Sequence, residues 1–271
     1  MKAELGLTTF TEGVVTSSLL FAAAIGATVT GTLADRIGRR KVLLILSWVF
    51  ILGTTTCVLA PSFAVMVPGR IALGFAVGRA SVTVPVYLAE MAPTEWRGRL
   101  SARNEVAVVI GQLLAFIFNA IIHQAWGHHE GVWRYMLAVA AIPAIMLFVG
   151  MLSMPESPRW LISKGRGEEA HEVLLQVRPK ERADAEFEAI AEVAAVEERA
   201  TSMSLSEALG VLWIRKLIII GTGIAVIQQL TGINSIMFYG TELLKTAGFG
   251  SDVAIVANIG NGVLSVTGMM I

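Results

Sequence analysis

Long apolar runs alternate with short charged segments along the chain. Five runs contain no charged residue between the charges that flank them: Glu12 to Asp35, Lys41 to Arg70, Glu105 to Glu130, Arg134 to Glu156, and Lys216 to Glu242. Two further runs are less clean, because residues 64–89 contain Arg70 and Arg79 and residues 253–271 reach the end of the sequence. A membrane-spanning helix needs about 20 predominantly apolar residues. The pattern therefore predicts seven transmembrane helices in an all-α integral membrane fold.

The charged residues are few and lie mainly on one predicted side of the membrane. Only 15% of the residues are charged and 55% are hydrophobic, whereas about a quarter of the residues are charged in soluble domains. Segments 35–41, 90–103 and 155–216 together hold 16 of the 21 lysines and arginines. Basic loops face the cytoplasm, so these segments are predicted to be cytoplasmic and the N-terminal segment extracytoplasmic. The formal net charge of zero argues against a nucleic-acid partner.

The only long polar region lies between the fifth and sixth predicted spans, at residues 155–215. Apolar residues recur there at helical spacing between charges, which predicts short amphipathic helices on the cytoplasmic surface. The sequence is therefore expected to have three parts. These are a five-span bundle at 1–154, a cytoplasmic linker at 155–215, and the start of a second bundle at 216–271.

Polar side chains recur on one stripe of three predicted spans. In chain order they include Glu105 and Gln112, then Gln228 with Gln229 beside it, then Asn258, Asn261 and Ser265. Polar groups are costly in lipid and tend to face protein or a cavity. One interpretation is that these amides only join neighbouring helices by hydrogen bonds. Three such stripes together favour a solute-binding cavity in the membrane.

Asn234 is expected to need a break in its helix before it can join the two glutamines. It lies about 120–140° around a regular helix from them. Gly232, between them, permits the helix to bend or unwind. Broken helices are how many transporters present polar groups to a solute.

The chemistry of these side chains suits an uncharged, polyhydroxylated solute, because each amide offers a donor and an acceptor to a hydroxyl group. Phe238 and Tyr239 add rings that can cover the apolar face of a sugar. No cofactor, metal site, nucleophile motif or phosphate-binding loop is predicted, so an enzyme is not expected. His123, His128 and His129 lack cysteine or carboxylate partners at ligand spacing, which favours a solvated loop.

Four motifs occur in order along the chain. They are Asp35-Arg-Ile-Gly-Arg-Arg40, then Pro85-Val-Tyr-Leu-Ala-Glu-Met-Ala-Pro93 with Arg97-Gly98, then Pro155-Glu-Ser-Pro-Arg-Trp-Leu161, and finally Gln228-Gln-Leu-Thr-Gly-Ile-Asn234. At these motifs, which with their intervening helices cover most of the chain, it resembles the sugar porter family of the major facilitator superfamily. The resemblance implies a partial fold of that superfamily, holding helices 2 to 8 of twelve.

The resemblance implies a transporter of sugars or polyols that works by alternating access. It would be secondary active or facilitative, and coupling to protons is the expectation. Gln228, Gln229 and Asn234 would correspond to its sugar-coordinating residues, and Phe238 and Tyr239 to its extracellular gating aromatics. Glu105 stands where many members have Gln, and Ser265 where many have Asn. These departures make an inositol-like polyol a reasonable expectation.

The charged motifs resemble the cytoplasmic latch of the family, which holds that side shut in the outward-facing state. The residues that the resemblance places in the latch are Asp35, Arg36, Gly38, Arg39, Arg40, Glu90, Arg97, Glu156 and Arg159. A simpler role for Arg36, Arg39 and Arg40 is to anchor the topology. Gly38 between them suggests a tight turn and favours the latch.

Arg70 resembles the fourth-helix arginine that pairs with a proton-exchanging aspartate of the first helix in proton-coupled members. That helix and the last four have no counterpart here, so the chain is expected to be a fragment of a protein that is monomeric at full length and lies in the plasma (cell inner) membrane. Two alternatives stay open: a membrane sugar sensor or receptor that does not transport, and an inactive truncated product. Arg79 has no functional account.

Overall fold

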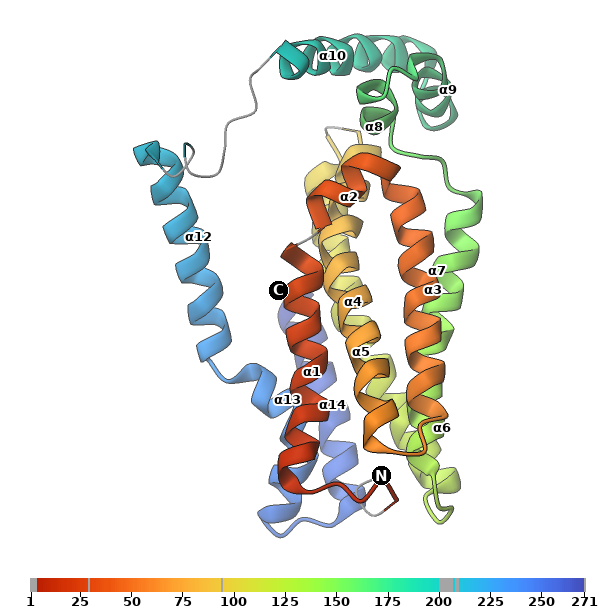
Figure 1. The fold of residues 1–271 in the computed structure, drawn as a ribbon, viewed down its shortest axis with the longest axis vertical. Helices are drawn as coiled ribbons and strands as arrows, with labels where there is room; N and C mark the ends of the chain where they lie inside the picture. The colour runs from red at the N-terminus through yellow and green to blue at the C-terminus, as the bar shows by residue number, and fades with distance from the viewer. Residues whose placement is uncertain (1–3, 29, 94, 200–206, 208–209, 271) are drawn as a thin grey trace.

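A computed structural model describes residues 4–28, 30–93, 95–199, 207 and 210–270. The regular elements of these residues are helices, as the sequence predicts (Figure 1). Those that cross or line the bundle are α1 (Thr9–Thr28), α2 (Thr30–Ile37), α3 (Arg39–Val58), α4 (Phe63–Met91), α5 (Arg97–Trp126), α6 (Val132–Ala138), α7 (Ala141–Ser153), α12 (Leu212–Leu230), α13 (Ile233–Thr246) and α14 (Ser251–Met270). Three more follow α7 in the polar region: α8 (Pro158–Ser163), α9 (Gly167–Val177) and α10 (Lys180–Arg199).

Six segments of the described chain are long and apolar enough to cross a bilayer. They are Thr9–Thr28, Arg39–Val58, Phe63–Met91, Arg97–Trp126, Val132–Ser153 and Leu212–Met237, which match six of the predicted spans. The seventh predicted span, residues 253–271, forms the 20-residue helix α14 beside α5. The all-α membrane fold is thus confirmed.

Close backbone contact joins α4 to its neighbours α1 and α3. Gly74 and Gly78 have the small-xxx-small spacing of tightly packed helices, and a Cβ on either would overlap a backbone carbonyl of α1, at Leu19 and Ala23 respectively. Gly69 approaches the backbone of α3 in the same way, since its Cβ would lie 3.1 Å from the Cys57 nitrogen. The three helices therefore form the tightly packed part of the bundle.

The polar region is helical and lies across the end of the bundle where α2 meets α3 (Figure 1). Ser157 caps α8 by accepting a hydrogen bond from the Trp160 backbone nitrogen at 3.3 Å, with Pro158 at the first helical position. The Trp160 indole donates to the Asp35 carbonyl at 2.9 Å and so fixes α8 to the bundle. Helix α10, with 20 residues, is longer than the short helices that the sequence predicts.

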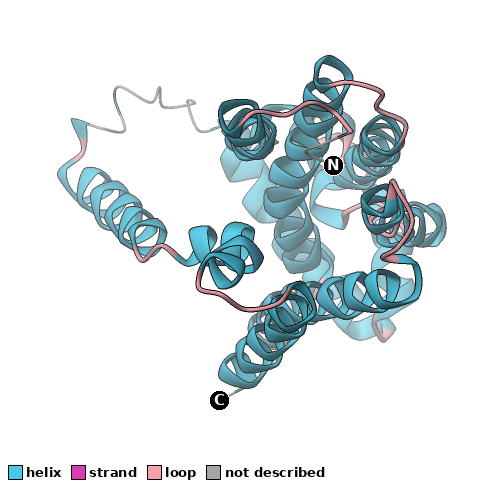
Figure 2. Ribbon diagram, turned by 90° about the horizontal axis from the view of Figure 1, so that it is seen from below, coloured by secondary structure: helices cyan, strands magenta, loops and turns pink. Residues whose placement is uncertain are grey.

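The predicted span between Lys216 and Glu242 is broken in two. Helix α12 ends at Leu230, and α13 begins at Ile233 after Gly232, whose φ of +76° suits glycine. Seen from below, α12 stands apart from the remaining spans while α13 returns to them (Figure 2). The break falls at the glycine that the sequence singles out.

Candidate functional site

Amide side chains from two helices meet at one sulfur atom of a third. Gln112 of α5 donates from Nε2 to the Sδ atom of Met237 on α13, at 2.8 Å. Asn261 of α14 donates from Nδ2 to the same sulfur at 3.4 Å. All three side chains are partly buried. The structure thus brings together one predicted ligand from the first five spans and one from the last span, and we call this set the amide cluster.

Helix α14 is held closely to its neighbours beside the amide cluster. A Cβ at Gly262 would lie 3.2 Å from the Leu113 Cα atom of α5, closer than ordinary van der Waals contact. Asn258 Nδ2 donates to the Thr241 hydroxyl of α13 at 2.7 Å. Ser265 instead donates back to the Asn261 carbonyl of its own helix at 2.9 Å. Asn258 and Asn261 therefore both face α13.

The glutamines of α12 lie outside the amide cluster. Gln228 and Gln229 are exposed, and no hydrogen bond joins either of them to Gln112 or Asn261. Tyr239 on α13 is also exposed. Asn234 and Phe238 belong to α13, but their side chains lie outside the described part of the chain.

Glu105 lines a separate groove. This cavity of about 590 Å³ lies among α3, α4, α5 and α7, and most of its walls are apolar. Asn104 Nδ2 lies 3.5 Å from Glu105 Oε1 at its edge. Glu105 precedes Gln112 by seven residues, about 10 Å along the helix axis, so the two ends of the predicted stripe meet different neighbours.

A charge network ties the α2–α3 corner to the end of α4. Arg39 lies 2.9 Å from Asp35 Oδ1 through Nη2 and 3.0 Å from Glu90 Oε2 through Nε. The same guanidinium donates from Nη1 to the Ala34 carbonyl at 3.0 Å. The side chains of Arg39 and Glu90 are each 13% exposed, so this ion pair is largely withdrawn from water.

A second group of contacts ties α3 to the segment after α7. Glu156 Oε1 accepts a hydrogen bond from the Arg40 backbone nitrogen at 3.0 Å. The Arg40 guanidinium donates to the carbonyls of Met151 and Leu152, at 3.0 and 2.8 Å, in the last turn of α7. Gly38 has a φ of +99°, and a Cβ there would overlap the Glu156 carboxylate. The backbone turn and the carboxylate therefore require a glycine at this position.

The other predicted latch residues are arranged less tightly. Arg97 Nε donates to the Ala89 carbonyl at 2.9 Å, which joins the start of α5 to the last turns of α4. Arg36 and Arg159 are exposed and form no ion pair with any residue that the structure describes. Arg36 and Arg159 therefore take no part in the contacts that Arg39 and Arg40 make.

Two arginines of α4 lie within the bundle. Arg70 is partly buried, and its Nε atom has no hydrogen-bond partner among the described residues. Arg79 is only 3% exposed and lies 5.7 Å from the centre of the Phe75 ring, with Nε and Nη2 also unpartnered within the described chain. Both guanidinium groups retain unused donors, which is costly inside a bilayer.

Comparison with known proteins places this arrangement in a family. The sequence profile described as "Sugar (and other) transporter" matches residues 2–271. The chain belongs to this sugar porter family. It is accordingly a multi-pass integral protein of the plasma membrane, in a family of transporters rather than enzymes.

Several bacterial sugar porters are similar in sequence. The major myo-inositol transporter IolT of Bacillus subtilis is 52% identical over 97% of this chain and 55% of its own length. The glucose transporter GlcP of Staphylococcus epidermidis is 37% identical over 97% of this chain and 57% of its own length. The chain therefore spans about half the length of the curated relatives that it matches.

Solved structures of the xylose transporter XylE share the fold of this sugar porter. The proton:xylose symporter XylE bound to 6-bromo-6-deoxy-D-glucose matches with a TM-score of 0.84 and 29% identity, over 99% of this chain and 60% of that one. The inward-open conformation of XylE from E. coli matches with a TM-score of 0.74 and 28% identity, over 95% of this chain and 58% of that one. The described helices thus form a partial major facilitator fold.

Met237 and Thr241 of this sugar porter were not predicted from the sequence. They lie four residues apart, on one face of α13. The sequence analysis named Gln228 and Gln229 before the break and Asn234 after it, but it named no residue of the face of α13 that meets α14. The break at Gly232 resets the helical phase, so a different face of α13 meets α14. A methionine carries no polarity signal, and only the spacing from Gly232 pointed to this change.

Proposed function

We propose that this chain is part of a secondary transporter that carries a sugar or polyol across the membrane by alternating access. The observation that carries the proposal is the convergence of Gln112 and Asn261 on Met237. It places neutral hydrogen-bonding groups from the first five spans and from the last span at one point. A solute bound there contacts both parts, so its binding responds to their relative movement.

The chemistry of the amide cluster supports exchange with a hydroxylated solute. A thioether sulfur is a weak acceptor, so the two amides that donate to Met237 hold it loosely. A hydroxyl oxygen is a better acceptor than a thioether sulfur, and the hydroxyl group also donates a hydrogen bond to the amide carbonyl. We therefore infer that the solute replaces the sulfur as the partner of Gln112 and Asn261.

Other predicted ligands join this proposal through the movement of α12. Gln228 and Gln229 precede the break at Gly232 and Asn234 follows it. We propose that a movement of α12 at the break brings the two glutamines to the solute beside Asn234. Asn258 and Ser265 lie on the same helix as Asn261 and complete its polar stripe. Phe238 and Tyr239, on the outer side of the break, would close over the bound solute.

We infer an inositol-like polyol as the preferred substrate and protons as the coupling ion. The relative IolT is named as a myo-inositol transporter. Glu105 lies two turns from Gln112 on α5, in a separate groove, and would accept from two hydroxyl groups of a polyol only where the solute reaches that groove. The neighbour XylE is named as a proton:xylose symporter, and Arg70 keeps a buried donor for a carboxylate partner. We propose that the full-length protein is monomeric, because the amide cluster is formed within one chain.

The charged contacts at the cytoplasmic end support a latch in this cycle. Asp35, Arg39 and Glu90 hold the α2–α3 corner to α4, while Arg40 and Glu156 hold α3 to the segment after α7. We propose that they stabilise the state that is closed on this side. The division into 1–154, 155–215 and 216–271 then separates a first bundle, a cytoplasmic linker and a second bundle.

Uptake of radiolabelled myo-inositol and D-xylose by the full-length gene product in proteoliposomes tests the proposal, with and without an inward proton gradient. We expect myo-inositol uptake that the gradient accelerates. Gln228→Ala should reduce uptake at least about tenfold, as loss of hydrogen bonds to a bound solute predicts, without changing membrane insertion. Gln124→Ala, on the last turn of α5 and exposed, is the matched control. Unchanged uptake in Gln228→Ala would refute its binding role, and solute binding without any uptake would favour a sensor.

A further inference from the structure

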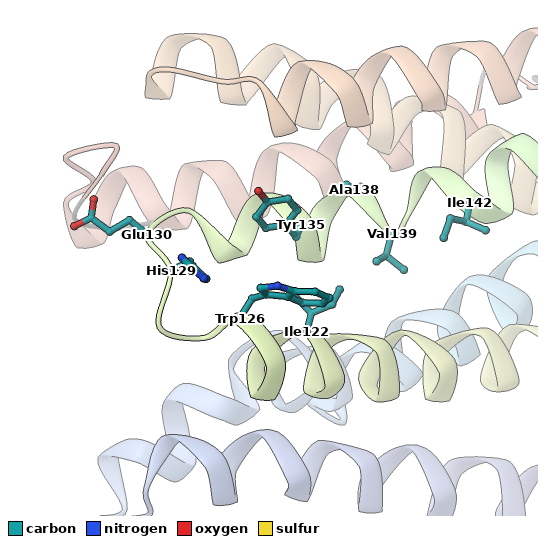
Figure 3. A pocket seen from close by; sticks show the side chains of 8 residues that line it. All are labelled: Ile122, Trp126, His129, Glu130, Tyr135, Ala138, Val139 and Ile142. Atoms are coloured by element: carbon teal, nitrogen blue, oxygen red, sulfur yellow. The ribbon is translucent and has the colours of Figure 1, made fainter.

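An open place on this chain does not by itself indicate a ligand site, because the chain spans about half the length of its relatives. Figure 3 shows such a place, a space of about 720 Å³ between Trp126 at the end of α5 and Tyr135 on α6. In a longer sugar porter a neighbouring helix can pack there. A contact that is already buried within this chain does not depend on such neighbours, and one of these lies among α8, α9 and α10.

These three linker helices form a small apolar core of their own. Trp160 of α8 and Val173 of α9 are buried in it, and Phe187 of α10 packs against them. The side chain of Met91, the last residue of α4, packs against the same core. The linker helices are therefore folded onto the end of α4.

Arg178 joins two of the linker helices. It precedes Pro179, which disfavours the α conformation in the residue before it, and its backbone is extended, so α9 ends at Val177. The Arg178 Nε atom lies 2.6 Å from Glu186 Oε2 of α10, and Nη2 donates to Glu186 Oε1 at 2.9 Å. The Arg178 side chain is only 2% exposed, so this ion pair is withdrawn from water.

The same guanidinium reaches α4. Nη2 of Arg178 donates to the Met91 carbonyl at 3.3 Å. The last carbonyl groups of a helix have no partner within it, and Arg97 of α5 donates to another of them. The Arg39–Glu90 ion pair lies on the same turn. Three arginines, from the starts of α3 and α5 and from the linker, thus converge on the last turn of α4.

We propose that Arg178 is a positioning residue for closure of the cytoplasmic side, because it mounts the linker helices on the turn of α4 that carries Glu90. Trp160 fixes α8 to the Asp35 carbonyl, so the linker helices are held at two separate points and move with the first bundle. A simpler role is that Arg178 only joins α9 to α10 through Glu186. The effect on transport rests on the proposed function, whereas the mounting does not.

Double electron–electron resonance on the full-length protein measures the mounting. Spin labels are placed at Lys41→Cys on α3 and Glu188→Cys on α10, which are both exposed positions. The native Cys57 is fully buried and does not compete for the label. Arg178→Met should broaden the distribution of distances between the labels, because the linker helices lose one of their two attachments.

Arg182→Met is the matched control. It removes the same charge from the start of α10, where the pair with Glu95 is 66% and 60% exposed. Exposed pairs contribute little, so the distance distribution should not change. An unchanged distribution in Arg178→Met, or equal broadening in the two variants, would overturn the proposal.

A double variant separates the mounting from the ion pair within the linker. Arg178→Met alone leaves Glu186 without its charged partner, whereas Arg178→Met with Glu186→Met removes both charges, and apolar replacement of a buried ion pair is often neutral for stability. The broad distribution should persist in the double variant, because the Met91 carbonyl still lacks its donor. Recovery of the narrow distribution would show that Arg178 acts only inside the linker, and the proposal would be wrong.

Uptake of myo-inositol tests the consequence for transport. Arg178→Met should lower the maximal rate about tenfold at an unchanged KM, as loss of one hydrogen bond of a charged group from a single conformational state predicts. Rates are normalised to the amount of protein in the membrane, which a folding defect would reduce. A raised KM at the normal maximal rate would contradict a positioning role. If the unmodified protein transports nothing while Arg178→Met broadens the distances, the mounting stands and the proposed function fails.

Discussion

The α1–α4 contact and helix α12 differ in how closely they are packed within one membrane protein. Gly74 and Gly78 bring α4 against the backbone of α1, where almost no space is left. Helix α12 has no buried residue among its 19 and is joined to the bundle through the break that precedes α13. The difference teaches that close packing and interruption of a helix are encoded separately, by small residues at the α1–α4 interface and by a left-handed glycine between α12 and α13.

Substitution at the tight interface should have the largest effect. Gly78→Leu forces a side chain into the Ala23 carbonyl of α1, which the backbone cannot avoid. We expect the free energy of unfolding to fall by more than about 3 kcal/mol, measured by denaturant titration in detergent. Gly221→Leu, at a glycine of α12 with open space around it, should be nearly neutral. Equal losses in the two variants would contradict the packing difference.

The charge network should be the next most sensitive region. Glu90→Gln leaves Arg39, which is 13% exposed, with the exposed Asp35 as its one charged partner among the described residues. We expect a loss of about 2–3 kcal/mol in unfolding free energy, somewhat below that for a fully buried pair. Glu95→Gln is the control, because its pair with Arg182 is 66% and 60% exposed and should contribute at most about 1 kcal/mol. A smaller effect at Glu90 than at Glu95 would be decisive against the network.

Arg97→Ala tests the role of the latch in the transport cycle, not its role in folding. It removes the hydrogen bond to the Ala89 carbonyl at the α4–α5 corner. Losing one hydrogen bond of a charged group, about 1.5–3 kcal/mol, from a single conformational state should slow turnover about tenfold or more. Binding of myo-inositol, measured by calorimetry, should persist. Transport at the normal rate would show that Arg97 has no part in the latch.

The weakly held amides should give the smallest effect. Met237→Leu conserves volume but removes the shared acceptor of Gln112 and Asn261. The free amides then lack a partner until the solute arrives, so the KM for uptake should fall about two- to threefold. Met269→Leu, exposed on α14, serves as the control. A KM that rises in Met237→Leu would mean that the sulfur itself contributes to binding.

The features that the sequence predicts well are those that act over short distances. The spans follow from apolar length and the break from Gly232. The spacing of Gly74 and Gly78 indicates close helix packing, although it does not identify α1 as the partner. The residues of the charge network stand in compact motifs, so their proximity at the cytoplasmic end could be expected from topology. Each of these needs only local geometry or the alternation of spans.

The amide cluster was predicted only in part. Gln112 and Asn261 were named from their stripes, but Met237 was not, because the phase of α13 depends on the dihedral angles at Gly232. Glu105 was grouped with Gln112 because both lie on one stripe, yet two turns of helix carry them to different neighbours. Packing between helices decides where Met237 lies and which neighbours Glu105 meets. The pattern of residues within one helix does not predict that packing.

The interruption at Thr231 and Gly232 also has a consequence for water. A regular helix satisfies its own backbone, whereas an interrupted one leaves carbonyl and amide groups that hydrocarbon cannot satisfy. The Thr231 hydroxyl meets the Gln228 carbonyl at 2.7 Å, which compensates for one such group. The Gly232 nitrogen donates to the Gln229 carbonyl at 3.3 Å in the same way. A backbone group of the break that has no such partner needs hydration if it lies inside a bilayer, so the interruption favours a wet interior beside α12 and α13.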